Sequence, residues 1–195
     1  GDYRGSAQEL LSAVRWGFLF QGQHYPWQKQ ARGRPALDVP PRQFLAFLEN
    51  HDQTANSAGG ERLATLAAPG LLRALTALLL LSPATPLLFQ GQERGSARPF
   101  RFFADHARPL ADAVRRGRRG FLSQFARYAA PEVAQRIDPA SPDAFRECVL
   151  ERDDDERSRR WLALHRDLLA LRRSDVVLLR GMRPEGAVLA ARSLL

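Results

Sequence analysis

Apolar residues along this chain form short runs that end abruptly at polar corners. The run at residues 43–48 ends at a cluster of carboxylate, amide and imidazole side chains at residues 49–53. The run at residues 85–89 ends at a second polar cluster at residues 90–93. Each run is short enough to form a buried strand. Between the two runs, apolar residues from 61 to 81 recur at helical spacing. This order favours an α/β fold in which parallel strands are joined by a helical crossover.

Apolar residues recur at helical spacing in several other parts of the chain. The predicted helices cover residues 6–20, 61–67, 70–81, 110–116 and 159–173. Pro69 suits the first turn of a helix, where its missing N–H has no helical partner. Trp161 follows the apolar spacing of its helix, which predicts that its ring lies in the core. The runs at residues 176–179 and 186–191 predict strands, so residues 1–173 and 174–195 are expected to belong to two domains.

Composition and charge narrow the class of protein. The chain has 195 residues and a net charge of +8, and Lys29 is its only lysine. The arginines are dispersed apart from the cluster at residues 115–119, which has no interleaved aromatic residues, so we expect no nucleic-acid partner. Cys148 is the only cysteine, which excludes an intrachain disulfide and favours a reducing, cytoplasmic compartment. The longest apolar run, residues 71–81, is too short to span a membrane.

Candidate catalytic chemistry lies at the polar ends of the two predicted strands. Functional side chains of (β/α) barrels sit where strands end, so both clusters are expected at one mouth. These side chains are Asn50, His51, Asp52, Gln53, Gln90, Gln92 and Glu93. A carboxylate beside an imidazole can orient sugar hydroxyls and can stabilise an oxocarbenium-like transition state. A second interpretation is that Asp52 caps the following segment and that His51 is a core histidine. The residues alone leave both interpretations open. His24 and His165 have no partners at metal-ligand spacing, so no metal or other cofactor is expected.

Several blocks of sequence resemble one enzyme superfamily. The segment Phe44-Leu45-Ala46-Phe47-Leu48-Glu49-Asn50-His51-Asp52-Gln53, followed by Gly60-Glu61-Arg62-Leu63, resembles a block of the α-amylase superfamily (glycoside hydrolase family 13). Residues 17–23, 79–93 and 98–106 narrow the resemblance to the malto-oligosyltrehalose trehalohydrolases within that superfamily. The resemblance implies the C-terminal part of a (β/α)8 TIM barrel, about strands seven and eight with their helices. The start of a small β domain would follow.

This resemblance also implies an activity and roles for the candidate residues. The expected reaction is retaining hydrolysis of the α-1,4 bond next to the trehalose end of maltooligosyl-trehalose, which releases trehalose. Asp52 would stabilise the transition state, while Asn50, His51, Gln53 and Glu93 would bind the substrate. The expected partner is therefore maltooligosyl-trehalose or another α-1,4-glucan, with no nucleic acid and no membrane. The nucleophilic Asp and the acid/base Glu of the superfamily would lie before Gly1, so the chain alone is expected to be inactive.

Some positions depart from the pattern of the family. Ser57, Gln92, Arg94 and residues 146–154 differ from the residue types expected there. Because Asp52 and His51 are intact, these departures are expected to affect substrate binding rather than the reaction type. Three alternatives stay open: another enzyme of the superfamily, such as a glycogen-branching or debranching enzyme, a non-catalytic carbohydrate-binding fragment, or a basic nucleic-acid-binding fragment.

Overall fold

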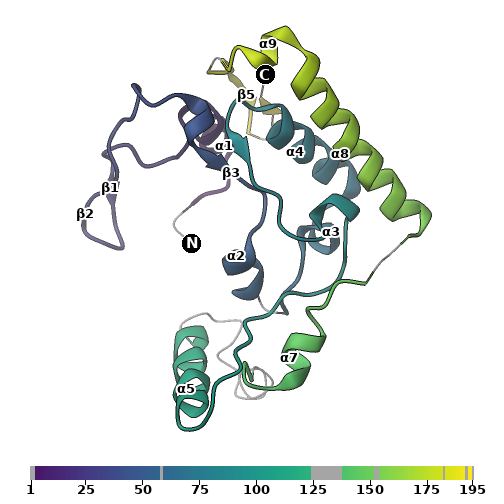
Figure 1. Ribbon diagram of the computed structural model, residues 1–195. Coiled ribbons are helices and arrows are strands. Elements are labelled where there is room, and N and C mark those ends of the chain that lie inside the picture. Colours follow the sequence, from purple (N-terminus) through teal and green to yellow (C-terminus); the bar gives the residue numbers. More distant parts are fainter. Residues whose placement is uncertain are drawn as a thin grey trace. The chain divides into compact units, whose positions relative to one another are not determined.

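The computed structural model describes residues 3–57, 59–123, 138–151, 154–181, 183–191 and 193–194 (Figure 1). The chain divides into two compact units. The first unit contains Gly1–Phe47, Leu75–Leu87 and His165–Leu195, and the second contains Leu48–Ala74 and Leu88–Leu164. Each unit is therefore assembled from segments that are distant in the sequence. The sequence-based division at residue 173 stays a prediction.

The first unit begins with a well-capped helix, α1 (Ala7–Trp16). The Ser6 hydroxyl accepts a hydrogen bond from the Glu9 N–H, and the Glu9 carboxylate accepts one from the Ser6 N–H, which is a capping box. The helix ends at Gly17, which adopts a left-handed conformation (φ 89°). A Cβ atom at Gly17 would lie 2.9 Å from the Phe44 ring. The predicted helix at residues 6–20 therefore stops earlier than expected, because the chain turns at this glycine.

The first unit also contains a pair of parallel strands. These are β3 (Leu45–Ala46) and β4 (Thr85–Pro86), with Leu45 opposite Thr85. The Thr85 N–H donates to the Phe44 carbonyl at 2.9 Å, and the Leu87 N–H donates to the Ala46 carbonyl at 2.8 Å. The predicted parallel pairing is confirmed, although both strands are shorter than their apolar runs. The chain between them forms α3 (Leu63–Leu66) and α4 (Pro69–Leu81), as the crossover pattern predicted.

The end of α4 is fixed by an arginine from a distant helix, α8 (Glu156–Ser174). The Arg172 guanidinium donates to the carbonyls of Leu80 at 2.9 Å and Ala84 at 2.8 Å, and also to the carbonyl of Ser82. Carbonyls in the last turn of a helix lack partners within that helix, so a cation there satisfies them. This arrangement holds the turn that leads from α4 into β4.

The remaining elements of the first unit are short. They are β1 (His24–Tyr25) antiparallel to β2 (Gln30–Ala31), the 3-10 helix η1 (Pro41–Gln43), α9 (Val176–Leu179), and β5 (Val188–Ala190) antiparallel to β6 (Ser193–Leu194). The strand predicted at residues 186–191 is confirmed only in its middle, at Val188–Ala190. The strand predicted at residues 176–179 is wrong, because these residues form α9. Asp175 caps this helix by accepting hydrogen bonds from the N–H groups of Val177 and Leu178.

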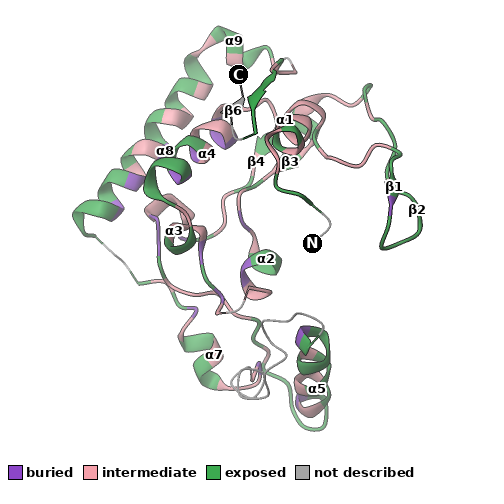
Figure 2. Cartoon of the chain, turned by 180° about the vertical axis from the view of Figure 1, so that it is seen from behind, coloured by how far each residue is buried: buried purple, intermediate pink, exposed green. Residues whose placement is uncertain are grey.

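The second unit contains the short helices α2 (His51–Ala55), η2 (Gln92–Arg94) and α7 (Pro142–Arg146), and the longer α5 (Leu110–Ser123). Figure 2 shows that α8 has both exposed and buried positions along its length. Ser158, Trp161 and His165 are buried on it, so the expected core position of Trp161 is confirmed. The Trp161 ring lies so close to Gly95 that a Cβ atom there would be 2.5 Å away. Within the described ranges, no helix is both long and apolar enough to cross a membrane.

Candidate functional site

The polar corner that follows β3 begins the helix α2. Asn50 is the N-cap residue, and its side-chain oxygen accepts a hydrogen bond from the Gln53 N–H at 2.9 Å. The Asn50 carbonyl accepts from the Thr54 N–H at 3.1 Å. Asparagine is favoured at this position because its side chain satisfies an N–H that has no partner within the helix. Asn50 therefore caps the helix, and Asp52 lies in its first turn.

The side chains of His51 and Asp52 both project into solvent. Their side chains are 68% and 74% exposed, and His51 Nε2 lies 3.5 Å from Asp52 Oδ1. Gln53, the next residue, is also exposed. The interpretation of His51 as a core histidine is therefore wrong, and so is the interpretation of Asp52 as the cap. A carboxylate and an imidazole stand together on the surface, where both can reach a ligand.

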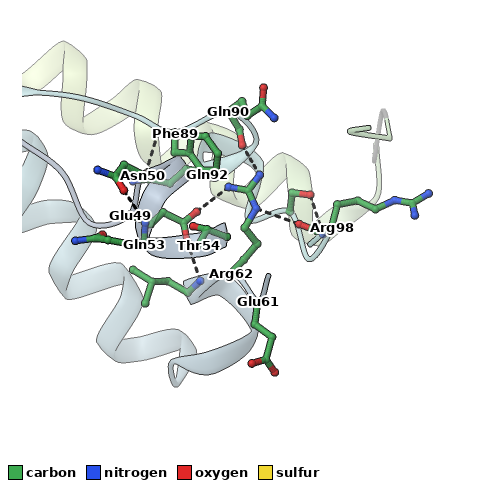
Figure 3. A network of polar contacts seen from close by, with 12 residues as sticks. Glu49, Asn50, Gln53, Thr54, Glu61, Arg62, Phe89, Gln90, Gln92 and Arg98 are labelled. Carbon is green, nitrogen blue, oxygen red and sulfur yellow. Dashed lines mark hydrogen bonds and ion pairs between the residues drawn. The ribbon is translucent and has the colours of Figure 1, made fainter. Parts of the chain in front are cut away.

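A buried ion pair, which was not predicted from the sequence, adjoins this corner through Glu49. Arg62 Nη1 donates to Glu49 Oε1 at 3.1 Å, and the two side chains are only 1% and 7% exposed. The second oxygen of Glu49 accepts a hydrogen bond from the Leu63 N–H at 2.9 Å (Figure 3). The signal in the sequence was a glutamate at the end of an apolar run, where a charged side chain needs a partner.

Arg62 also reaches the segment that follows β4. Its Nη2 donates to the Gln90 carbonyl at 2.7 Å, and its Nε donates to the Arg98 carbonyl at 3.0 Å. The guanidinium carbon lies 4.4 Å from the centroid of the Phe89 ring, a cation–π distance (Figure 3). Burial lowers the pKa of Arg62, whereas the Glu49 carboxylate raises it. One side chain thus connects the chain before Asp52 with the chain before Gln92.

The second polar cluster lies around η2. Gln92 and Glu93 are half-buried in η2, and Gln90 is exposed just before it. The Gln92 side-chain oxygen accepts a hydrogen bond from the Phe89 N–H at 3.3 Å. The negative charge of Glu93 opposes the lowering of the Arg62 pKa by burial, as the Glu49 carboxylate does more strongly. The structure therefore joins the two clusters through Arg62, which contacts Glu49 and Gln90 directly.

The far end of α2 is held by α5. The Arg118 guanidinium donates to the Asn56 side-chain oxygen and to the Ala55 carbonyl, both at 2.6 Å. It also lies 5.3 Å from the Phe102 ring centroid and 5.6 Å from that of Phe121. The basic cluster at residues 115–119 gave no hint of this role, because partners 62 residues away are not visible in a local pattern.

Three positions that were expected to depart from the family pattern make local contacts. The Ser57 hydroxyl donates to the Thr54 carbonyl at 2.8 Å and accepts from the Glu61 N–H at 2.9 Å. Gln92 makes the contact with the Phe89 N–H given above. The Arg94 guanidinium lies 3.5 Å from the Ser158 hydroxyl at the start of α8. These departures therefore serve the local structure, and their effect on substrate stays a prediction.

Among the residues that the structure describes, no group of three His, Cys, Asp or Glu side chains could hold a metal ion. Cys148 is buried, and its sulfur accepts a hydrogen bond from the Arg101 N–H at 3.1 Å. The sulfur also lies 3.0 Å from the Ala144 carbonyl. This packing agrees with the interpretation of Cys148 as a small buried side chain. The chemistry that the described residues offer is thus that of an exposed carboxylate and imidazole on a helix capped by Asn50.

Comparison with solved structures gives the class of protein. The chain is similar to a crystal structure of a protein assigned as an alpha amylase in Salmonella typhimurium, with a TM-score of 0.83 and 40% sequence identity. The similarity covers 97% of this chain and 32% of that one. The fold of this chain is therefore similar to about a third of that protein, whose class is built on a TIM barrel. No model of a protein family matches the chain.

Comparison with curated proteins narrows this class. The chain is 39% identical over 181 residues to a malto-oligosyltrehalose trehalohydrolase of Deinococcus radiodurans, which covers 90% of this chain and 30% of that protein. It is 37% identical to the enzyme of the same name in Arthrobacter ramosus, covering 87% of this chain and 29% of the relative. It is 31% identical to the enzyme of the same name in Saccharolobus solfataricus, and this match covers 75% of this chain and 24% of the relative. The chain thus spans less than a third of the length of these relatives. The resemblance drawn from the sequence is confirmed: over most of its own length, this chain is related to malto-oligosyltrehalose trehalohydrolases, which are glycoside hydrolases.

Proposed function

We propose that this chain is the C-terminal part of a retaining glycoside hydrolase that releases trehalose from maltooligosyl-trehalose. It supplies about strands seven and eight of the (β/α)8 barrel, here β3 and β4, and the start of a small β domain after residue 173. The bond cleaved is the α-1,4 bond next to the trehalose end. The proposal rests above all on the relatives of 31–39% identity that carry this enzyme name.

The candidate residues have distinct roles in this reaction. A retaining glycosidase passes through an oxocarbenium-like transition state, which a nearby negative charge stabilises. Asp52 provides that charge and holds sugar hydroxyls, and His51 donates a hydrogen bond to the same ring. Gln53 and Glu93 bind neighbouring hydroxyls, while Asn50 supports them as the cap of α2. The nucleophilic Asp and the acid/base Glu come from the part of the enzyme that precedes this chain.

Two features of the described residues support a glucan as the partner and argue against nucleic acid. His51 and Asp52 are exposed side by side, which suits a ligand rich in hydroxyl groups. In the basic cluster, Arg115 pairs with Asp112 and Asp138 at 2.8 and 2.7 Å, and Arg118 holds the end of α2. Arg115 and Arg118 are therefore engaged within the chain rather than displayed for phosphates. We also expect a cytoplasmic location, because a single free cysteine is typical of a reducing compartment.

The test is a chimera in which this chain replaces the aligned residues of the Deinococcus radiodurans relative. Products are identified after incubation with maltotriosyl-trehalose and, separately, with maltopentaose. Release of trehalose from the first substrate, with little cleavage of the second, supports the proposal. Cleavage or transfer of maltopentaose without trehalose release would favour another α-amylase-type enzyme. The chain alone serves as a control and is expected to cleave neither substrate, because it lacks two of the three carboxylates.

A further inference from the structure

Arg62 is buried at the junction of two segments that carry candidate site residues. Its guanidinium donates to the Glu49 carboxylate, the Gln90 carbonyl and the Arg98 carbonyl, at 3.1, 2.7 and 3.0 Å. Glu49 precedes the Asn50 cap of α2 by one residue, and Gln90 precedes η2 by two. The three contacts use all three nitrogens of the side chain, and Figure 3 shows them converging on it.

Arginine is the side chain that suits this junction. Its planar fork points donors in several fixed directions, whereas lysine offers a compact charge on a flexible stem. The side chain is 1% exposed, so each donor needs a partner within the protein. Glu49 neutralises the cation with one oxygen and receives the Leu63 N–H with the other. One buried guanidinium therefore contacts both segments at the same time.

We propose that Arg62, through Glu49, is a positioning residue that fixes the His51–Asp52 corner relative to the segment from Gln90 to Glu93. This inference rests on the proposed function, because it assigns both segments to one sugar site. Arg62 itself is buried and does not touch substrate. Its effect is exerted through the Glu49 carboxylate, which precedes α2, and through the Gln90 carbonyl, which precedes η2. Catalytic geometry is sensitive to small shifts, and a misplacement of about 1 Å can cost on the order of 100-fold in rate.

The first test measures amide hydrogen–deuterium exchange in the full chain and needs no activity. In Arg62→Met, we expect faster exchange in residues 50–57 and in residues 89–96 together, because one group restrains both. The double variant Glu49→Leu/Arg62→Met removes both charges, so its thermal stability should recover. Its exchange in the two segments should stay raised. Arg115→Met removes a different arginine, which pairs with the Asp112 and Asp138 carboxylates, and serves as the control; it should leave exchange in both segments unchanged.

The second test measures kinetics in the chimera described above. In Arg62→Met, kcat for trehalose release should fall on the order of 100-fold, with a much smaller change in KM. Arg62→Lys should be intermediate, because lysine keeps the charge but lacks the fork. The double variant should keep the low kcat although its melting temperature recovers, and Arg115→Met should keep the kcat of the unmodified chimera.

The outcomes separate this inference from the proposed function. Recovery of exchange or of kcat together with melting temperature in the double variant would mean that Arg62 only stabilises the fold, and would overturn the inference. Unchanged exchange in residues 89–96 of Arg62→Met would overturn it as well. A folded but inactive unmodified chimera would count against the proposed function, while the exchange experiment would still decide the role of Arg62.

Discussion

The substitution Arg62→Met tests whether the buried ion pair holds the second unit together. The Glu49 side chain is only 7% exposed, and the substitution would remove its partner cation. Of the two hydrogen bonds described for this carboxylate, only the one from the Leu63 N–H would stay. The substitution would also remove the donors to the Gln90 and Arg98 carbonyls. Breaking one partner of a buried pair costs about 3–5 kcal/mol, because the other charge stays buried without compensation.

This loss of stability can be measured as a fall in the melting temperature. For a chain of this size, each kcal/mol shifts the midpoint by about 2–4 °C, so Arg62→Met should lower it by about 6–20 °C. Thermal and urea unfolding of the chain, followed by circular dichroism, would measure the change. The double variant Glu49→Leu/Arg62→Met should regain most of the loss, because no unpaired charge stays in the interior.

The control is an ion pair that is exposed to solvent, unlike the buried Glu49–Arg62 pair. Arg146 and Asp143 form a pair at 3.0 Å, and both side chains are 73% exposed. Arg146→Met should cost less than about 1 kcal/mol, because water screens exposed charges. If Arg62→Met cost no more than Arg146→Met, or if the double variant were as unstable as the single one, the reasoning about the buried pair would be refuted.

Three further substitutions test other parts of the second unit. Gly60→Ala should lower the free energy of unfolding by at least about 1–2 kcal/mol, because Gly60 has φ +72° and a Cβ atom there would lie 2.7 Å from the Phe100 carbonyl oxygen. Gly117→Ala in α5, where a Cβ atom meets nothing within 4 Å, should instead stabilise the chain by up to about 1 kcal/mol in urea unfolding. A hydrogen bond from Arg115 lowers the pKa of Asp138 below its ordinary value. Asp138 therefore contributes to the free energy of unfolding at pH values above its unfolded-state pKa. This contribution is lost as the pH falls through its folded-state pKa. Urea unfolding across the acid range should show a shallower loss for Asp138→Asn, and an unchanged profile would contradict this.

The parallel strand pair and the helices between its strands could be predicted from local patterns. Apolar runs, polar corners and the position of Pro69 are visible without knowledge of distant contacts. The helix at residues 159–173 was equally clear, because Trp161 recurs with other apolar residues at helical spacing. In these places the local pattern and the folded chain agree, as in sequences with little frustration.

The failures have physical causes that a local pattern does not contain. Val176 and Val177 are β-branched residues that favour strands. They form the helix α9 instead, whose N-terminus is capped by the Asp175 side chain. The site showed the same limit. Asp52 and His51 were found from their residue types, whereas Glu49 and Arg62 are paired across 13 residues in the interior. Their importance depends on burial, which the sequence alone does not specify.

The central claim is that Asp52 stabilises the transition state of a trehalose-releasing hydrolase. The most direct measurement is kcat/KM for maltotriosyl-trehalose in the chimera carrying Asp52→Asn, compared with Asp143→Asn. The two aspartate side chains are similarly exposed, at 74% and 73%. We expect Asp52→Asn to lose on the order of 1,000-fold, as expected when one electrostatic partner of the transition state is removed, and Asp143→Asn to be unchanged. Full activity in Asp52→Asn would contradict the claim.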